Sequence, residues 1–111
     1  MQVSAKISSI RITPRKMGLL ADEIRGKGIN DALTYLRLSP RKRTAEILYR
    51  LLKSAAANAD QKGTVDVDTL FVKTILVGKG VTMKRFRPRA KGSAFPIHKM
   101  SSHVSVTLAE R

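Results

Sequence analysis

The sequence contains no cysteine and no tryptophan, and two tyrosines and three phenylalanines supply all of its aromatic side chains. Without thiols, disulfide bonds and thiolate metal sites are excluded, which is consistent with a reducing compartment. Because aromatic residues are so few, stacking of nucleobases on a row of aromatic rings is not expected to be the main mode of binding.

Long apolar runs are also missing from the chain. No stretch reaches the length that a membrane-spanning helix needs, and residues 1–6 lack the apolar segment of a signal peptide. We therefore expect a cytoplasmic protein that has no membrane partner.

Acidic residues are scarce as well. The chain has 22 Lys and Arg against 8 Asp and Glu, a net charge of +14 and a pI near 11.0. Residues 69–109 contain eight Lys or Arg and no acid. Charge of one sign destabilises a compact chain by self-repulsion, so we expect a polyanionic partner, most simply the phosphates of a nucleic acid. A merely soluble basic domain is the alternative, since 42% apolar residues suffice for a folded core.

Hydrophobic spacing predicts a strand and then a helix at the start of the chain. Residues 3–12 are expected to form a short strand, because Val, Ala and Ile partly alternate with polar residues. Thr13-Pro14 is typical of a helix start, with a hydroxyl cap before proline at the first helical position. Gly26 is typical of a helix end. The helix between them has one apolar face, formed by Met17, Leu20, Ala21 and Ile24.

Two further helices are expected in the middle of the chain. Asn30-Asp31 is predicted to cap a short helix that buries Ala32, Leu33 and Leu36. Ser39-Pro40 repeats the start signal for a longer helix over about residues 40–60. Its apolar stripe is formed by Ala45, Leu48, Leu52, Ala55, Ala56 and Ala59, widened by Ile47 and Leu51.

Apolar residues recur with a period of two in residues 65–77 and in residues 103–108. This alternation predicts two strands. If they pair antiparallel, residues 79–102 connect them, and so long a connection is usually functional. Alternatively, both strands continue into one long hairpin. Residues 69–88 would then span roughly 60 Å, far more than a body radius of gyration of about 12 Å. Such a hairpin lacks a core and would be ordered mainly by what it binds.

Together these elements predict an α+β fold, in which three helices pack on a small antiparallel sheet and a long β-hairpin protrudes. We expect a single domain over residues 1–111. Its globular part comprises about residues 1–78 and 102–111, and its extended basic hairpin arm comprises about residues 79–101.

Residues that could form a catalytic or metal site are few. His98 and His103 are the only histidines, and the arm holds no carboxylate to orient either of them. Asp66 and Asp68 could share a strand face, but two carboxylates alone make a poor metal site. Residues 78–80 lack the spacing and the following helix of a phosphate-binding loop. We therefore expect no enzyme, no cofactor and no metal.

The basic residues fall into three groups: the first strand with the start of the first helix, the helix ends and turns, and the arm. A cation at a helix C-terminus, such as Arg25, can stabilise the helix by interacting with its dipole and need not bind a nucleic acid. Arg15 and Lys16 lie near a helix N-terminus, where a bound phosphate would offset their repulsion by the dipole. Proline between Arg87 and Arg89 stiffens the arm and lowers the ordering cost of binding.

Five segments resemble one protein family at once. They are ITPRK at residues 12–16, ADEIRGK at 21–27, LKSAAANA at 52–59, MKR with PRAKG inside 83–92, and SHV at 102–104. In this order and spacing they cover almost the whole chain. The sequence thereby resembles the bacterial large-subunit ribosomal protein twenty-two family.

The resemblance implies a structural constituent of the large ribosomal subunit that binds 23S-type ribosomal RNA and aids assembly. The implied hairpin tip lines the nascent-peptide exit tunnel and comprises Arg89, Ala90, Lys91, Gly92 and Ser93. Implied partners are neighbouring large-subunit proteins and, transiently, the nascent peptide; no homo-oligomer is expected, and an organellar ribosome is left open. The residues expected to contact ribosomal RNA are Lys6, Arg11, Arg15, Lys16, Arg25, Lys27, Lys42, Lys79, Lys84, Arg85, Arg87, Arg89, Lys91, His98, Lys99 and His103.

Two departures from the family pattern concern the arm. Ser93 stands where the family often has a basic residue, which leaves the residue-specific contacts in the tunnel open. Residues 78–80 replace a stretch that is often acidic, which adds positive charge at the base of the arm.

Two other functions compete with a ribosomal role. A free-standing nucleic-acid-binding module, such as a DNA-compacting protein, would favour a symmetric dimer, and the sequence offers no obvious spare apolar face for one. An RNA-modifying enzyme would need a cofactor loop or a catalytic acid and base, and the sequence supplies neither.

Overall fold

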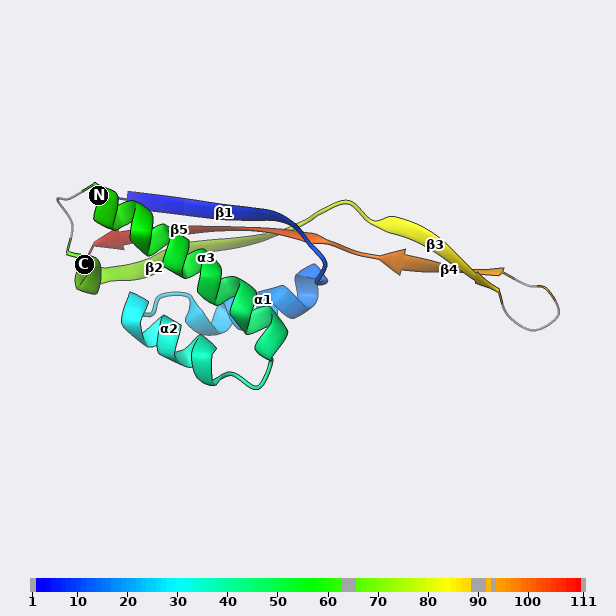
Figure 1. Ribbon diagram of the computed structural model, residues 1–111, viewed down its shortest axis with the longest axis horizontal. Coiled ribbons are helices and arrows are strands. Elements are labelled where there is room, and N and C mark those ends of the chain that lie inside the picture. Colours follow the sequence, from blue (N-terminus) through cyan, green and yellow to red (C-terminus); the bar gives the residue numbers. More distant parts are fainter. Residues whose placement is uncertain (1, 63–65, 89–91, 93, 111) are drawn as a thin grey trace.

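The chain folds into a body of helices and sheet from which a two-stranded arm projects (Figure 1). The computed structural model describes residues 2–62, 66–88, 92 and 94–110. The molecule measures 64 × 25 × 17 Å along its principal axes. In chain order its elements are β1 (Gln2–Ile10), α1 (Pro14–Ile24), α2 (Ile29–Leu38), α3 (Lys42–Gln61), a 3₁₀ helix η1 (Val67–Thr69), β2 (Leu70–Lys79), β3 (Met83–Pro88), β4 (Ala94–Lys99) and β5 (Ser102–Glu110). The predicted α+β fold is confirmed.

Three strands of the body form one antiparallel sheet in the order β1-β5-β2. β5 is the central strand, since Ile7 of β1 and Val77 of β2 both lie opposite its Val104. α3 packs along β1 and β5, and α1 packs against β2 (Figure 1). The helices therefore cover one face of the sheet, and its other face is open.

The core lies between the helices and the covered face of the sheet. The apolar face predicted for α1 is buried at all four positions, and Leu33 and Ala56 are half-buried and pack against the core. Burying one large aliphatic side chain stabilises a fold by roughly 1.5–3 kcal/mol, so this layer holds the body together. Its members from α3 include Ala45, Leu48, Leu51, Leu52, Ala55 and Ala59.

The ends of α1 follow the sequence prediction. The backbone N–H of Lys16 donates to Thr13 Oγ1 at 3.4 Å, and proline occupies the first turn. Beyond the helix, Gly26 has φ +85°, a left-handed conformation that glycine adopts without steric cost. Its N–H donates to the Val72 carbonyl at 2.9 Å, which ties the end of α1 to β2.

The predicted cap of α2 is wrong. Gly28 is the N-cap, and Asn30 and Asp31 lie inside the first turn. The Asn30 side-chain amide instead donates to Asp68 Oδ1 at 3.3 Å, across 38 residues of sequence. Asp31 in the first turn still stabilises the helix, because a negative charge there complements the helix dipole.

α3 begins later than predicted. The Ser39 hydroxyl accepts a hydrogen bond from the Arg41 backbone N–H at 3.3 Å, so it closes a turn and does not cap the helix. Arg41 itself has the non-helical angles φ −85° and ψ 66°. The helix therefore starts at Lys42 and continues to Gln61.

β2 also begins later than the predicted residue 65, at Leu70. Asp66 Oδ1 accepts a hydrogen bond from the Asp68 N–H at 3.0 Å, and Thr69 Oγ1 donates to the Asp66 carbonyl at 2.8 Å. These local bonds wind the residues before β2 into η1. Val65 lies outside the described residues.

The long-hairpin alternative for the connection is the correct one. β3 and β4 pair antiparallel from Met83 opposite Lys99 to Pro88 opposite Ala94. They form a sheet separate from that of the body, so the hairpin is interrupted where it leaves the body. We call this junction, residues 80–82 and 100–101, the arm root. There the Gly80 N–H donates to the Ser101 carbonyl at 2.9 Å.

Candidate nucleic-acid interface

The arm presents cations on both of its strands. Lys84 and Arg85 are exposed on β3, and His98 and Lys99 are exposed on β4. Lys84 lies opposite His98 in the ladder. The sequence of the arm contains no Asp or Glu, so its charges are moderated only by salt and solvent. The arm is therefore a narrow cationic ribbon.

The predicted tip falls largely outside the described part of the chain. Arg87 lies on β3, whereas Arg89, Ala90, Lys91 and Ser93 are outside the described residues. Gly92 is exposed and has φ +72°. Residues with a side chain rarely adopt this left-handed conformation, so the backbone at position 92 favours glycine.

A second group of predicted contacts lies on β1 and the start of α1. Lys6, Arg11, Arg15 and Lys16 are all exposed. Arg43 of α3 donates to the Arg11 carbonyl at 3.5 Å, which brings a further cation beside this group. Arg15 and Lys16 occupy the first turn of α1. Pro14 has no N–H and the Lys16 N–H donates to Thr13, so among residues 14–16 the Arg15 N–H remains to bind an anion beside the two side chains.

Two predicted RNA contacts have partners inside the protein. Arg25 forms an ion pair with Asp22 and donates to the Ile75 carbonyl at 2.9 Å. The Lys27 ammonium lies over the Tyr35 ring, 4.1 Å from its centroid. These cations hold the end of α1 against β2 and α2. They are weaker candidates for RNA binding than the cations of the arm.

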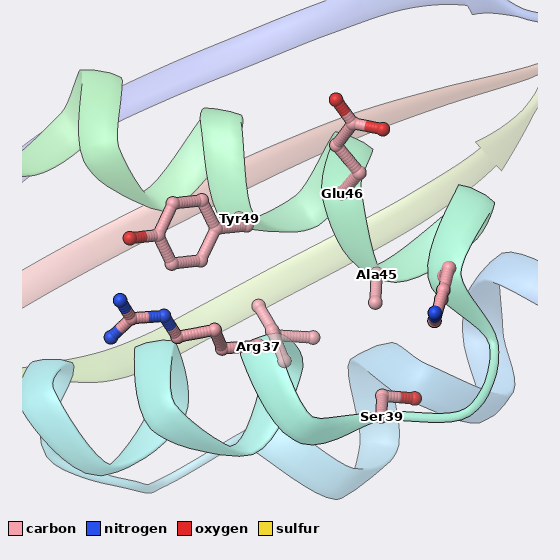
Figure 2. A pocket seen from close by; sticks show the side chains of 7 residues that line it. Arg37, Ser39, Ala45, Glu46 and Tyr49 are labelled. Carbon is pink, nitrogen blue, oxygen red and sulfur yellow. The ribbon is translucent and has the colours of Figure 1, made fainter.

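A groove of about 310 Å³ lies between α2 and α3. Figure 2 shows Arg37 and Tyr49 facing each other across one end of it, from α2 and α3 respectively. Lys42, a predicted RNA contact, also lines the groove. Glu46 lines it too, but is paired with Arg50 at 2.7 Å. The sequence prediction missed Arg37 and Tyr49 as groove residues, because only the packing of the two helices brings them together.

A hollow of about 430 Å³ lies where the sheet approaches the arm root. We call it the root hollow. Two predicted contacts, Lys6 and His103, line it, and the Ser9 N–H donates to His103 Nδ1 at 3.0 Å. No motif signalled Ser9, since it precedes His103 by 94 residues. The remaining lining residues are Ile7, Ser8, Leu76, Gly78, Val104 and Ser105.

Within the described residues, no three His, Asp or Glu side chains gather as they would around a metal ion. His98 lies on the arm and His103 on the sheet of the body, so the two histidines belong to different surfaces. In the described part of the chain, none of the helices combines the length and the apolar character needed to span a membrane.

An α+β body with a protruding basic hairpin defines a class of proteins that extend a charged arm away from a folded core. The family model of ribosomal protein L22p/L17e matches residues 5–109. The chain belongs to this family; it is a ribosomal protein and not an enzyme. The family resemblance inferred from the five sequence segments is thereby confirmed.

Relatives of similar length match the chain from end to end. The relative from Citrifermentans bemidjiense is 55% identical over 111 residues, covering 100% of this chain and 99% of the relative. That from Geobacter metallireducens is 54% identical and covers both chains completely. That from Trichlorobacter lovleyi is 54% identical over 110 residues, 99% of this chain and 96% of the relative. Each is named large ribosomal subunit protein uL22.

Proposed function

We propose that the protein is a structural constituent of the bacterial large ribosomal subunit that binds 23S-type ribosomal RNA and aids its assembly. The observation that carries this proposal is the described ribbon of exposed arm cations, in an arm whose sequence contains no acid. The name shared by the full-length relatives gives the subunit. Phosphate is the polyanion that such a ribbon fits best.

Recognition of the RNA is expected to depend on its folded shape. Lys and Arg contacts to phosphate position a protein but carry little sequence information, and double-stranded RNA is recognised mostly through its shape and backbone. The contacts that we propose are the sixteen residues predicted from the sequence, with the arm residues Lys84, Arg85 and Lys99 as the principal ones.

We also infer that the arm reaches the exit tunnel and that its tip lines the tunnel wall. The 64 Å length of the molecule supports this inference, because it exceeds the other two dimensions of 25 and 17 Å more than twofold. A structure this narrow can pass between RNA helices. The proposed tip is Arg89 to Ser93, where the nascent peptide is a transient partner.

The chain is proposed to act as one domain, with its arm over about residues 79–101 inserted into the subunit and its body beside neighbouring ribosomal proteins. Its expected location is the ribosome in the cytoplasm. No homo-oligomer is proposed.

Fractionation of native cell extracts on sucrose gradients tests the proposal. After a high-salt wash, mass spectrometry should find the protein in stoichiometric amounts in the large-subunit peak. Recovery in free fractions or with the nucleoid would contradict the ribosomal role and would favour a free-standing DNA-binding module.

The tunnel assignment needs its own experiment. A photo-crosslinking amino acid at position 93 should crosslink to a stalled nascent chain in purified ribosomes. The same amino acid at Lys53, on α3 of the body, is the matched control and should not. Crosslinking from neither position would contradict the placement of the tip.

A further inference from the structure

The root hollow combines polar and apolar groups in two rows that cross the sheet. In one row, Lys6 of β1 and Leu76 of β2 both lie opposite Ser105 of β5. Two residues along β5, on the same face of the sheet, Gly78 lies opposite His103. Lys6 is exposed and Leu76 is 62% exposed. The lining of the hollow contains no Asp or Glu.

The orientation of the His103 ring is fixed from both sides. Its Nδ1 accepts the hydrogen bond from Ser9, and Ser9 has φ +58°, at the irregularity where the β1–β5 register shifts. On the other side lies Gly80: a Cβ built there would be 3.1 Å from His103 Nε2 and 2.5 Å from Ser101 Oγ. The ring therefore needs glycine at position 80 and a bent backbone at Ser9.

The bond from Ser9 also fixes the tautomer of His103. A nitrogen that accepts a hydrogen bond carries the lone pair, so the proton of the neutral ring is on Nε2. His103 is exposed, and its Nε2–H, on the side of the ring next to Gly80, is a donor without charge. The hollow and its rim at the arm root thus offer one cation from Lys6, one N–H from His103 and one hydroxyl from Ser105.

This combination matches one unit of an RNA backbone. An ammonium group binds a phosphate oxygen as a point charge. A neutral N–H and a hydroxyl suit the ribose 2′-hydroxyl, which both donates and accepts. Leu76 offers apolar surface to the carbons of the sugar, and Gly78, without a side chain, allows the strand to approach closely. A free phosphate ion would leave Leu76 without a contact.

We propose that the root hollow is a binding site for one phosphate–ribose unit of ribosomal RNA, held by Lys6, His103 and Ser105. The site rests on the proposed function, because it assumes that ribosomal RNA is the partner. It differs from the arm in kind, since His103 contributes a hydrogen bond without a charge.

The test measures the affinity of the full-length protein for a transcript of Geobacter metallireducens 23S ribosomal RNA over a series of salt concentrations. Lys6→Gln should lower the slope of log affinity against log salt by about one, since one phosphate contact is lost. His103→Asn keeps an acceptor near the position of Nδ1 and removes the Nε2 donor. It should weaken binding about three- to tenfold and leave the slope unchanged.

Two controls separate the site from general charge and from misfolding. Lys53→Gln removes the same charge from α3, on the covered side of the sheet, and should change the affinity and slope less than Lys6→Gln. His103→Gln places an amide donor near the position of Nε2 and should bind better than His103→Asn. Thermal unfolding of each variant identifies any loss of folding.

The possible results distinguish the two proposals. If Lys6→Gln and His103→Asn fold and bind like the unmodified protein while an arm variant binds more weakly, the root hollow is not a binding site. Lys6 and His103 then leave the set of proposed contacts, and the proposed binding of ribosomal RNA through the arm stands. If the unmodified protein does not prefer the ribosomal transcript to polyuridine of equal length, the proposed function fails first. A reduced salt slope for His103→Asn would show that His103 acts as a charge and would overturn its neutral role.

Discussion

The body and the arm are stabilised in opposite ways. In the body, side chains such as Leu48, Leu52 and Val106 are 0% exposed between helices and sheet. In the arm, Phe86 is 72% exposed and the two strands pair only with each other. Isolated two-stranded hairpins are marginal in water. We therefore expect the body to fold on its own side chains and the arm to depend on a partner that holds it in place.

The comparison also separates two uses of charge. In the body, Arg25 and Arg50 have acidic partners at i−3 and i−4 on their own helical segments. In the arm no acid is available, so each added cation repels its neighbours until an anion binds. The charge of the arm therefore suits the proposed binding of an anion and lowers the stability of the free arm.

Leu48→Ala should produce the largest change in stability. Leu48 is fully buried in α3, and truncating such a residue costs roughly 2–5 kcal/mol. Urea unfolding followed by circular dichroism measures the loss. Phe86→Ala in the arm is the matched control and should change the unfolding free energy by less than about 0.5 kcal/mol. Equal losses would show that the arm contributes to the core.

Gly80→Ala should have the next largest effect, at the boundary between the two regions. The added Cβ would lie 2.5 Å from Ser101 Oγ, so this hydroxyl, which donates to the Val81 carbonyl at 2.7 Å, must move. Overpacking of this kind costs roughly 1–3 kcal/mol. Gly78→Ala meets only an ordinary 3.9 Å contact with the His103 carbonyl and should be tolerated. Equal stability of both variants would contradict the close packing described for the root.

Thr13→Ala should have a smaller effect, confined to the body. It removes the hydroxyl that accepts the Lys16 N–H, and loss of such a cap typically costs about 1 kcal/mol. Thr13→Ser retains the hydroxyl and should restore most of the stability in thermal unfolding. RNA affinity at a temperature where both variants are folded should change little, because the side chains of Arg15, Lys16 and the arm are all retained.

Removing arm charges should affect stability least and binding most. Replacing Lys84, Arg85 and Lys99 with Gln should change the unfolding free energy by less than about 0.5 kcal/mol. The salt slope of RNA binding should fall by about two to three, as expected for three phosphate contacts. The control carries Gln at Lys53, Lys62 and Lys73, three exposed body residues. An equal salt slope in both triple variants would contradict the proposal that the arm cations are the principal phosphate contacts.

Periodicity in the sequence was enough to predict which face of α1 is buried. Met17, Leu20, Ala21 and Ile24 follow a helical spacing, and the structure buries all four because that spacing places them on one side of α1. Both ends of α1 were equally predictable, since Thr13 at its start and Gly26 beyond its end act locally on the backbone.

Competing hydrogen-bond partners explain the errors. Asn30 was expected to cap α2, but Asp68 binds its side chain from 38 residues away. Ser39 was predicted to mark the start of α3, but its hydroxyl accepts the N–H of Arg41, two residues away, and closes a turn. A local pattern identifies residues that are able to cap a helix, but it does not reveal which other partner competes for them.

The candidate interface was predictable in composition but not in shape. The absence of acid in the arm is visible in the sequence, so the exposed cations of β3 and β4 were expected. The root hollow was not, because it requires Ser9 beside His103 and a glycine at position 80 that admits the ring. The groove between α2 and α3 likewise exists only after the two helices pack.

Hydrogen exchange measured by mass spectrometry, on the free protein and on the protein within purified large subunits, tests the central claim most directly. We predict slow exchange of β1, β2, β5 and the helices in both samples, because the body is stable by itself. β3 and β4 should exchange rapidly in the free protein and slowly in the subunit. Equal protection of arm and body in the free protein, or rapid exchange of the arm within the subunit, would contradict the claim that a ribosomal partner orders the arm.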